Sequence, residues 1–128
     1  MPLEPGNVYI GRGDADLVIA RRASGLVAMA APSSPDFTWH PSADRLVASA
    51  MDLLAPERLI GVLMTGMGAD GAATMRDLHE RGGRTIAEAE ETAVVWGMPG
   101  ALVRAGGASS VVPLDRIAAE LVASLPHK

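Results

Sequence analysis

An unbroken apolar run, residues 59–64 (Leu-Ile-Gly-Val-Leu-Met), leads directly into the Gly-rich segment Thr65-Gly66-Met67-Gly68-Ala69-Asp70-Gly71, and few folds accommodate that combination. An apolar run without polar alternation is typical of a strand covered on both faces, as strands of parallel sheets are. The pattern then predicts a helix from about residue 70 to residue 81, ended by Gly82-Gly83, and a second strand over 84–88. Strand, helix and strand make one βαβ unit, so the sequence predicts an α/β fold built on a parallel sheet.

The remaining elements surround this unit in a single domain, which we place at residues 1–128 because the length suits one hydrophobic core. Loop-forming residues 31–39 separate a β-rich N-terminal part from the helix that precedes the βαβ unit. A break at Gly97-Met98-Pro99-Gly100 is expected to precede a short helical piece that ends at Arg104. The other expected elements are strands over 8–10, 16–20, 26–29 and 110–113, a hairpin across Ala23-Ser24-Gly25, a helix capped by Ser42 and stopped by Pro56, and a last helix over 115–125.

The chain has few groups that would bind a nucleic acid or a membrane. Its formal net charge is −4, and basic residues cluster nowhere beyond Arg21-Arg22, which disfavours electrostatic binding to nucleic acid or anionic lipid. Apolar runs such as residues 59–64 are far too short to span a bilayer, so no membrane insertion is expected. Small molecules or proteins are therefore the expected partners.

The absence of cysteine excludes disulfides, thiolate nucleophiles and zinc–thiolate sites together. The start Met1-Pro2-Leu3-Glu4 has neither the basic residues nor the apolar core of a secretory signal, so a cytoplasmic location is expected. Histidines and carboxylates show no metal-ligand spacing, and we expect no metal. Aromatic residues make up only 3% of the chain, so the core is expected to be aliphatic, as in helix-on-sheet layers.

The Gly-rich segment admits three interpretations. At the carboxyl end of a parallel strand, the N-terminus of the next helix stabilises anions and oxyanions. The first interpretation is a dinucleotide-binding loop, since Gly66-x-Gly68-x-x-Gly71 has the right spacing and Glu88 or Glu90 lies near the position of a ribose-binding acid. Asp70 opposes it, because its carboxylate would repel a pyrophosphate. In the second, the glycines only let strand and helix pack closely, with Asp70 in the first helical turn.

The third interpretation is catalytic: Asp70 orients a histidine, while the N–H groups of Met67 and its neighbours stabilise a tetrahedral oxyanion. His79 follows Asp70 by nine residues along one helix, roughly 13 Å, so it cannot meet that carboxylate and is expected on the surface. His127 falls in the C-terminal tail, whereas His40, just before a helix, could fold over the site. The chain has no Gly-x-Ser-x-Gly elbow, and none of its serines has the context of a nucleophile.

Six segments of the chain, in order, resemble motifs of one enzyme family. Residues 61–72, Gly-Val-Leu-Met-Thr-Gly-Met-Gly-Ala-Asp-Gly-Ala, resemble the signature of the chemotaxis protein-glutamate methylesterases of the CheB type. Pro5-Gly6-Asn7-Val8-Tyr9 resembles the family's Pro-Gly-x-Val-Tyr turn and strand. The other matching segments are Pro41-Ser42-Ala43-Asp44, Gly82-Gly83-Arg84-Thr85-Ile86-Ala87, Val94-Val95-Trp96-Gly97-Met98-Pro99 and Val112-Pro113-Leu114-Asp115-Arg116-Ile117.

The resemblance implies a doubly wound parallel sheet and an enzyme that hydrolyses glutamate methyl esters on methylated chemoreceptors, often deamidating receptor glutamines too, through a Ser-His-Asp triad. Asp70 matches the triad aspartate, and Met67 matches the position whose backbone N–H faces the developing oxyanion. No cofactor is implied. In a dinucleotide site the Asp70 carboxylate would repel the pyrophosphate. In a triad, by contrast, a carboxylate in this loop is needed to hold the imidazolium, so the resemblance accounts for Asp70.

The chain departs from the family pattern in its triad. The family's nucleophilic serine, in a Gly-Ala-Ser-Thr-Gly-Gly loop, and its histidine both precede the Pro-Gly-x-Val-Tyr segment, and neither motif is present. Loss of a triad nucleophile costs on the order of 10⁶ in rate, so we expect the chain alone to be inactive or nearly so. Smaller departures are His40 where the family often has arginine, Glu88 where glutamine is usual and Ala89 where aspartate is usual.

We therefore expect a doubly wound α/β sheet that lacks its N-terminal strands and carries a small β-hairpin. Missing inner strands expose an apolar, unpaired edge, which predicts self-association or pairing with another chain that supplies the serine and histidine. Methylated chemoreceptors are the expected substrates, and a response-regulator receiver domain is a further candidate partner. The alternative is a non-catalytic protein-interaction module of a chemosensory pathway.

Overall fold

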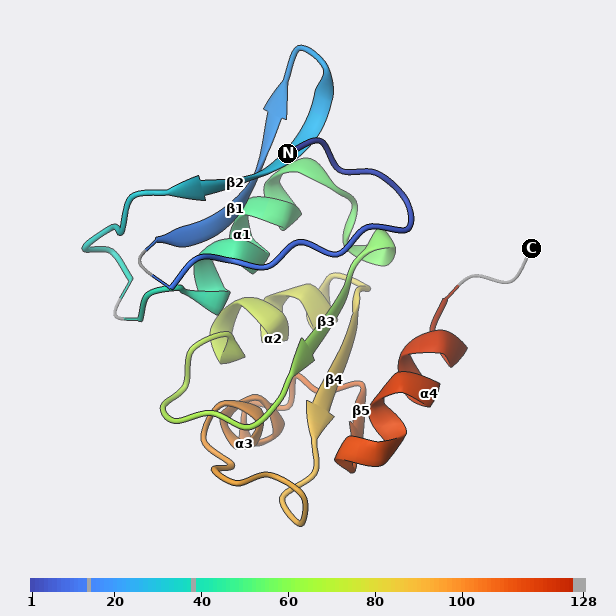
Figure 1. Ribbon diagram of the computed structural model, residues 1–128. Coiled ribbons are helices and arrows are strands. Elements are labelled where there is room, and N and C mark those ends of the chain that lie inside the picture. The colour runs from blue at the N-terminus through green and yellow to red at the C-terminus, as the bar shows by residue number, and fades with distance from the viewer. Residues whose placement is uncertain (14, 38, 126–128) are drawn as a thin grey trace.

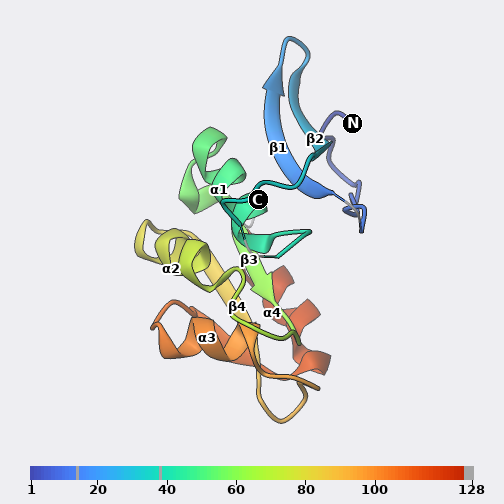
Figure 2. The same cartoon turned by 90° about the vertical axis from the view of Figure 1, so that its left-hand side faces the viewer.

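A β-hairpin and one helix lie above a three-stranded sheet that has helices on both faces, in a computed structural model that describes residues 1–13, 15–37 and 39–125 (Figure 1). The elements in chain order are β1 (Asp16–Arg22), β2 (Gly25–Ala31), α1 (Ala43–Leu53), a 3₁₀ turn (Pro56–Arg58), β3 (Ile60–Leu63), α2 (Ala72–Glu80), β4 (Arg84–Glu88), α3 (Met98–Arg104), β5 (Ser110–Val112), a second 3₁₀ turn (Leu114–Arg116) and α4 (Ile117–Ala123). Figure 2 shows α2 and α3 on one side of the sheet and α4 on the other. The predicted α/β fold with a doubly wound sheet and a separate hairpin is confirmed.

The three-stranded sheet is parallel throughout, in the order β3-β4-β5. The central strand β4 is buried from Thr85 to Glu88. In β3 only Leu63 is buried, and residues 60–62 are half-buried. The prediction that residues 59–64 contain a strand is confirmed, but the prediction that both faces are covered is wrong. Within the described residues β3 pairs only with β4, so it is an edge strand.

Apolar side chains from β3, β4, α2 and α3 form the core below the hairpin. Helix α2 packs closely on β3 at Gly61, where an added Cβ would lie 2.8 Å from the Cε of Met75 and would force that side chain to shift. The predicted βαβ unit is therefore confirmed, with an aliphatic core. The buried cluster consists of Leu63, Ala72, Met75, Ala87 and Leu102.

The hairpin pairs β1 with β2 in antiparallel register around the turn residues Ala23 and Ser24, as predicted. It packs on α1, where the Ile19 N–H donates to Ser49 Oγ at 2.9 Å. An edge strand with free N–H groups is a site for unwanted pairing. The bond to Ser49 occupies one such group and fixes the hairpin to the helix.

Residues 8–10 do not form the predicted strand. Val8 and Ile10 are 88% and 89% exposed, and neither belongs to a sheet. The edge of β2 that such a strand would need is occupied by the N-terminus, since the Ala28 N–H donates to the Met1 carbonyl at 2.8 Å. The residue types suited a strand, but the neighbouring edge of β2 was already taken.

Helix α3 begins at Met98, where the sequence predicts a break through Gly100. Pro99 lies in the first turn, in which no intrahelical bond needs its missing N–H, so proline is compatible with a helix start. The predicted break is therefore wrong. The helix after Ser42 is confirmed, because the Ser42 hydroxyl accepts from the Arg45 N–H. None of the helices in the described part of the chain is long and apolar enough to cross a membrane.

Leu102 on α3 offers a test of the core, because it is completely buried in the central cluster. Leu102→Ala removes contacts and leaves a cavity, so we expect the free energy of unfolding, measured by urea denaturation, to fall by about 2–5 kcal/mol. Val122→Ala on α4, where the side chain is 64% exposed, is the control. We expect it to change the free energy by less than about 0.5 kcal/mol, and equal losses in the two variants would contradict this assignment of the core.

Candidate active site

The Gly-rich segment forms the loop between β3 and α2, at the carboxyl edge of the sheet. Gly68 and Gly71 have φ values of +79° and +89°, in the region that side chains rarely adopt. Gly97 of the loop before α3 lies against this segment, because an added Cβ there would lie 2.5 Å from the Gly66 carbonyl oxygen. The Gly97 N–H also donates to that oxygen at 3.0 Å. The glycines therefore let two loops meet in direct backbone contact.

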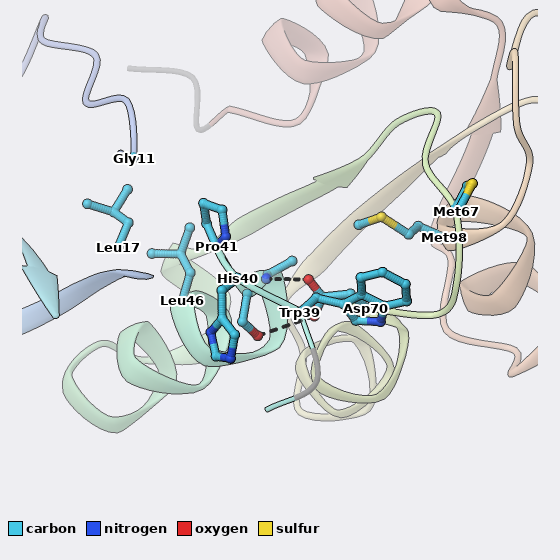
Figure 3. A pocket seen from close by; sticks show the side chains of 11 residues that line it. Gly11, Leu17, Trp39, His40, Pro41, Leu46, Met67, Asp70 and Met98 are labelled. Atoms are coloured by element: carbon cyan, nitrogen blue, oxygen red, sulfur yellow. Dashed lines mark hydrogen bonds between the residues drawn. The ribbon is translucent and has the colours of Figure 1, made fainter. Parts of the chain in front are cut away.

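Asp70 lies in this loop and is only 8% exposed. Its carboxylate accepts three bonds from the start of α1: Oδ2 from the Ala43 N–H at 2.7 Å, and Oδ1 from the Asp44 N–H at 3.0 Å and the Ser42 hydroxyl at 3.3 Å. Figure 3 shows two of these bonds. Asp70 is not in the first turn of α2, as the packing interpretation expected, because α2 begins only after Gly71 with its positive φ. Its negative charge stabilises the N-terminus of α1 instead.

A second carboxylate, that of Asp16 on β1, binds the same end of α1, and sequence reasoning missed it. The Asp16 side chain is fully buried. Its oxygens accept from the Ser42 N–H at 2.9 Å and from the Arg45 guanidinium at 2.8 Å, and they lie 3.0 and 3.1 Å from His40 Nδ1. The Arg45 guanidinium lowers the pKa of Asp16 most strongly, burial opposes it, and His40 and the Ser42 N–H lower the pKa further. The only sequence signal was an acidic residue at the start of a β-rich segment.

A cavity of about 430 Å³ lies between this helix end and the Gly-rich loop (Figure 3). Met67 in its wall is 66% exposed, and the Met67 N–H makes no hydrogen bond to any residue that the structure describes. The structure therefore brings the sequence-predicted residues Asp70 and Met67 to one cavity, together with His40. The polar, aromatic and thioether residues in its wall are Trp39, His40, Ser42, Met67, Asp70 and Met98.

The histidines in the described chain are bonded to partners other than Asp70. His40 lines the cavity, but its Nδ1 faces Asp16, and its ring is directed away from Asp70 in Figure 3. His79 is half-buried, not on the surface as expected, and its Nδ1 lies 2.9 Å from Ser109 Oγ. His127 falls outside the described residues. Within the described residues, Asp70 therefore has no imidazole partner.

The geometry removes one of the two acids considered for a dinucleotide site, whereas Glu90, the other, is exposed. Glu88, one candidate for the ribose-binding acid, is 1% exposed, and its two oxygens accept from the Thr65 N–H at 2.8 Å and from the Thr92 hydroxyl at 2.9 Å. No ribose can reach a carboxylate that is buried in this way. Among the described residues no three carboxylates or histidines are grouped to hold a metal ion.

Comparisons with known proteins identify the family of this chain. The sequence profile described as CheB methylesterase matches residues 1–121. The chain is 61% identical over 120 residues to a protein-glutamate methylesterase/protein-glutamine glutaminase of Rhodopseudomonas palustris, and 56% identical over 121 residues to one of Rhodospirillum rubrum. Each match covers 94% of this chain and 33% of the relative, so the chain spans about a third of the length of the curated relatives it matches.

The solved CheB methylesterase catalytic domain of Thermotoga maritima matches the fold with a TM-score of 0.87 at 31% sequence identity, covering 96% of this chain and 65% of that one. The parallel sheet with helices on both faces and a Gly-rich loop at its carboxyl edge defines a doubly wound α/β domain. More specifically, the chain belongs to the CheB methylesterase family. The resemblance carried by the six motifs is thereby confirmed.

Asp16 predicts that the fold loses stability in acid. Its pKa is lowered in the folded chain, mainly by Arg45, so the ionised carboxylate stabilises the fold at neutral pH. This contribution is fully present above the ordinary aspartate pKa of 3.8 and is lost as the pH falls through the lower pKa of the folded state. We expect the free energy of unfolding, from urea titrations below about pH 5, to fall more steeply for the wild type than for Asp16→Asn. Parallel curves for the two proteins would contradict this.

Proposed function

We propose that this chain carries part of the active site of a protein-glutamate methylesterase, which hydrolyses glutamate methyl esters on methylated chemoreceptors and deamidates glutamines there. The observation that carries the proposal is Asp70, a buried carboxylate fixed at the carboxyl edge of the sheet, beside the cavity that Met67 also lines. The relatives from Rhodopseudomonas and Rhodospirillum support it, because their names state both activities.

In the proposed reaction Asp70 orients a histidine. An ionised carboxylate has about four lone-pair sites, and Asp70 uses three of them on α1. The remaining site accepts the N–H of an imidazole. The imidazole is then held in the tautomer that takes a proton from a serine, and Asp70 stabilises the imidazolium that forms.

The backbone N–H of Met67 is the proposed donor to the oxyanion that forms when the serine oxygen attacks the ester carbonyl carbon. When this intermediate collapses, the bond to the methoxy group breaks, and methanol leaves with the proton carried by the histidine. Water, activated by the same histidine, then hydrolyses the acyl-enzyme to free glutamate and restores the serine. For a glutamine side chain the leaving group is ammonia.

The serine motif of this scheme, Gly-Ala-Ser-Thr-Gly-Gly, does not occur in these 128 residues. We propose that another segment supplies the serine and histidine by packing beside β3, whose outer edge has no strand among the described residues. An apolar groove along this edge, between α1, α2 and β3, supports that placement. A second copy of the chain is proposed to pair at the same edge. A receiver-domain partner is proposed from the family resemblance alone, and a cytoplasmic location from the start Met1-Pro2-Leu3-Glu4, which does not resemble a secretory signal.

The function is tested by methanol release from methylated receptor. The chain is assayed alone and mixed with a separately made N-terminal segment of the family that carries the serine and histidine motifs. We expect activity only in the mixture, because a triad without its nucleophile loses on the order of 10⁶ in rate. Activity of the chain alone would contradict this and direct attention to His40 with a serine of this chain. An inactive mixture whose joint folding is shown by circular dichroism would favour the non-catalytic interaction module.

Asp70→Asn tests the carboxylate itself. In the active mixture we expect kcat to fall by about 10⁴, because an amide does not hold the histidine in the productive tautomer. Asp44→Asn is the matched control, since Asp44 lies at the same helix end and bonds to Thr74 but does not line the cavity. Equal losses in both variants would mean that Asp70 acts only by stabilising α1.

A further inference from the structure

The carboxyl group of Glu88, at the end of the central strand β4, is a buried acidic group that the proposed reaction does not use. Glu88 is 1% exposed, and no basic side chain of the described residues forms an ion pair with it. A buried carboxylate without a cation is costly unless hydrogen bonds replace its lost water. Its hydrogen-bond partners therefore indicate its role.

Glu88 joins the loops that follow β3 and β4. Its Oε1 accepts from the Thr65 N–H at 2.8 Å, and its Oε2 accepts from the Thr92 hydroxyl at 2.9 Å. Its backbone carbonyl accepts from the indole N–H of Trp96 at 2.7 Å. Thr65 immediately precedes the Gly66-Met67 peptide, and Thr92 and Trp96 lie in the facing loop. A single residue therefore anchors both loops.

The two loops also bond to each other beside Met67. The Gly66 N–H donates to the Val95 carbonyl at 2.9 Å. The Gly66 carbonyl accepts from the N–H groups of Gly97 and Met98 at 3.0 and 2.9 Å. The backbone that leads into Met67 is thus held on both sides of Gly66, by a network whose buried end is Glu88.

We propose that Glu88 is a positioning residue, which sets the direction of the Met67 N–H through Thr65 and the 92–97 loop. Glu88 does not line the cavity shared by Met67 and Asp70, so it acts through the loop and does not touch the substrate. The consequence for catalysis rests on the proposed esterase function, whereas the hold on the loop does not.

Glutamine is the rescue variant at this position. Its amide oxygen can accept from the Thr65 N–H, and its NH₂ group can donate to the Thr92 hydroxyl oxygen, so both links survive with one reversed. Leucine is similar in size but has no polar atom in its side chain, and Glu88→Leu leaves the Thr65 N–H without its acceptor. Thr92→Val removes the partner of Oε2 and also the acceptor of the Leu114 N–H, which donates to the Thr92 hydroxyl at 3.0 Å.

The hold on the loop is tested by amide hydrogen exchange of the ¹⁵N-labelled chain, read by NMR. The informative amides are those of Gly66, Gly97 and Met98, because Glu88 is not their acceptor. In Glu88→Leu we expect them to exchange about tenfold faster or more, since the Thr65 N–H loses its acceptor and with it a restraint on local opening. The Met67 amide resonance is expected to shift, which a role confined to Thr65 would not produce.

The other variants make the result specific. In Glu88→Gln the amides of Gly66, Gly97 and Met98 should exchange at rates within about twofold of the wild-type rates. In Thr92→Val their exchange rates should lie between those of Glu88→Gln and Glu88→Leu. Thr92→Val retains Glu88, so the exchange measurement can be made on this variant if Glu88→Leu does not fold. Glu120→Gln on α4, where the carboxylate bonds to Ser110, is the matched control and should leave these amides unchanged. The positioning role would be overturned if exchange of these amides were unchanged in both Thr92→Val and Glu88→Leu. It would also be overturned if Glu88→Gln accelerated their exchange as much as Glu88→Leu does.

Activity separates this proposal from the one on which it rests. In a mixture that is active with the wild-type chain, Glu88→Leu should lower kcat about tenfold with little change in KM, because an oxyanion donor acts in the transition state. Wild-type kcat despite faster loop exchange would overturn the link between Glu88 and the oxyanion. If the wild-type mixture is inactive, the proposed function fails, and the exchange data still decide whether Glu88 holds the loop.

Discussion

Four backbone N–H groups at the start of α1 join the hairpin, the helix and the Gly-rich loop. A helix leaves its first four N–H groups without intrahelical partners. Here those groups, on residues 42–45, all bond to side-chain oxygens: Asp16 accepts the first, Asp70 the second and third, and the Ser42 hydroxyl the fourth. Bonds to a charged acceptor are stronger than bonds between neutral groups. One helix end therefore fixes two segments that are distant in the sequence.

Two carboxylates at one helix end are tolerated because they are neutralised differently. Asp16 has the Arg45 guanidinium at 2.8 Å and is fully buried. Asp70 forms no ion pair with a described residue and depends on N–H groups and the helix dipole. A cation at Asp70 would have occupied the lone pair that an imidazole needs. Asp70 is thereby left with a lone-pair site that no described residue occupies, as its proposed role requires.

The βαβ unit could be predicted because its signals are local: an apolar run, then glycines that end a helix, then another apolar run. The hydrogen bonds of Asp70 could not, since their donors lie 26–28 residues away in the sequence. The resemblance selects Asp70 and Met67 as site residues, but it does not reveal Asp16, which no motif includes. The errors at residues 8–10 and at Pro99 have a common cause, because a local pattern does not show which strand edge is free or whether an N–H is needed.

The two proposed site residues, Asp70 and Met67, lie in a loop that is held by contacts within the described chain. Asp70 is held by α1, and the backbone before Met67 is held by Glu88 and Gly97. A strand added beside β3 would thus meet groups that are already placed, which lowers the entropic cost of assembling a site. What such a strand must still satisfy is register. Side chains alternate between the faces of a sheet, so a slip of one residue would turn a serine to the wrong face while Asp70 and Met67 stayed in place.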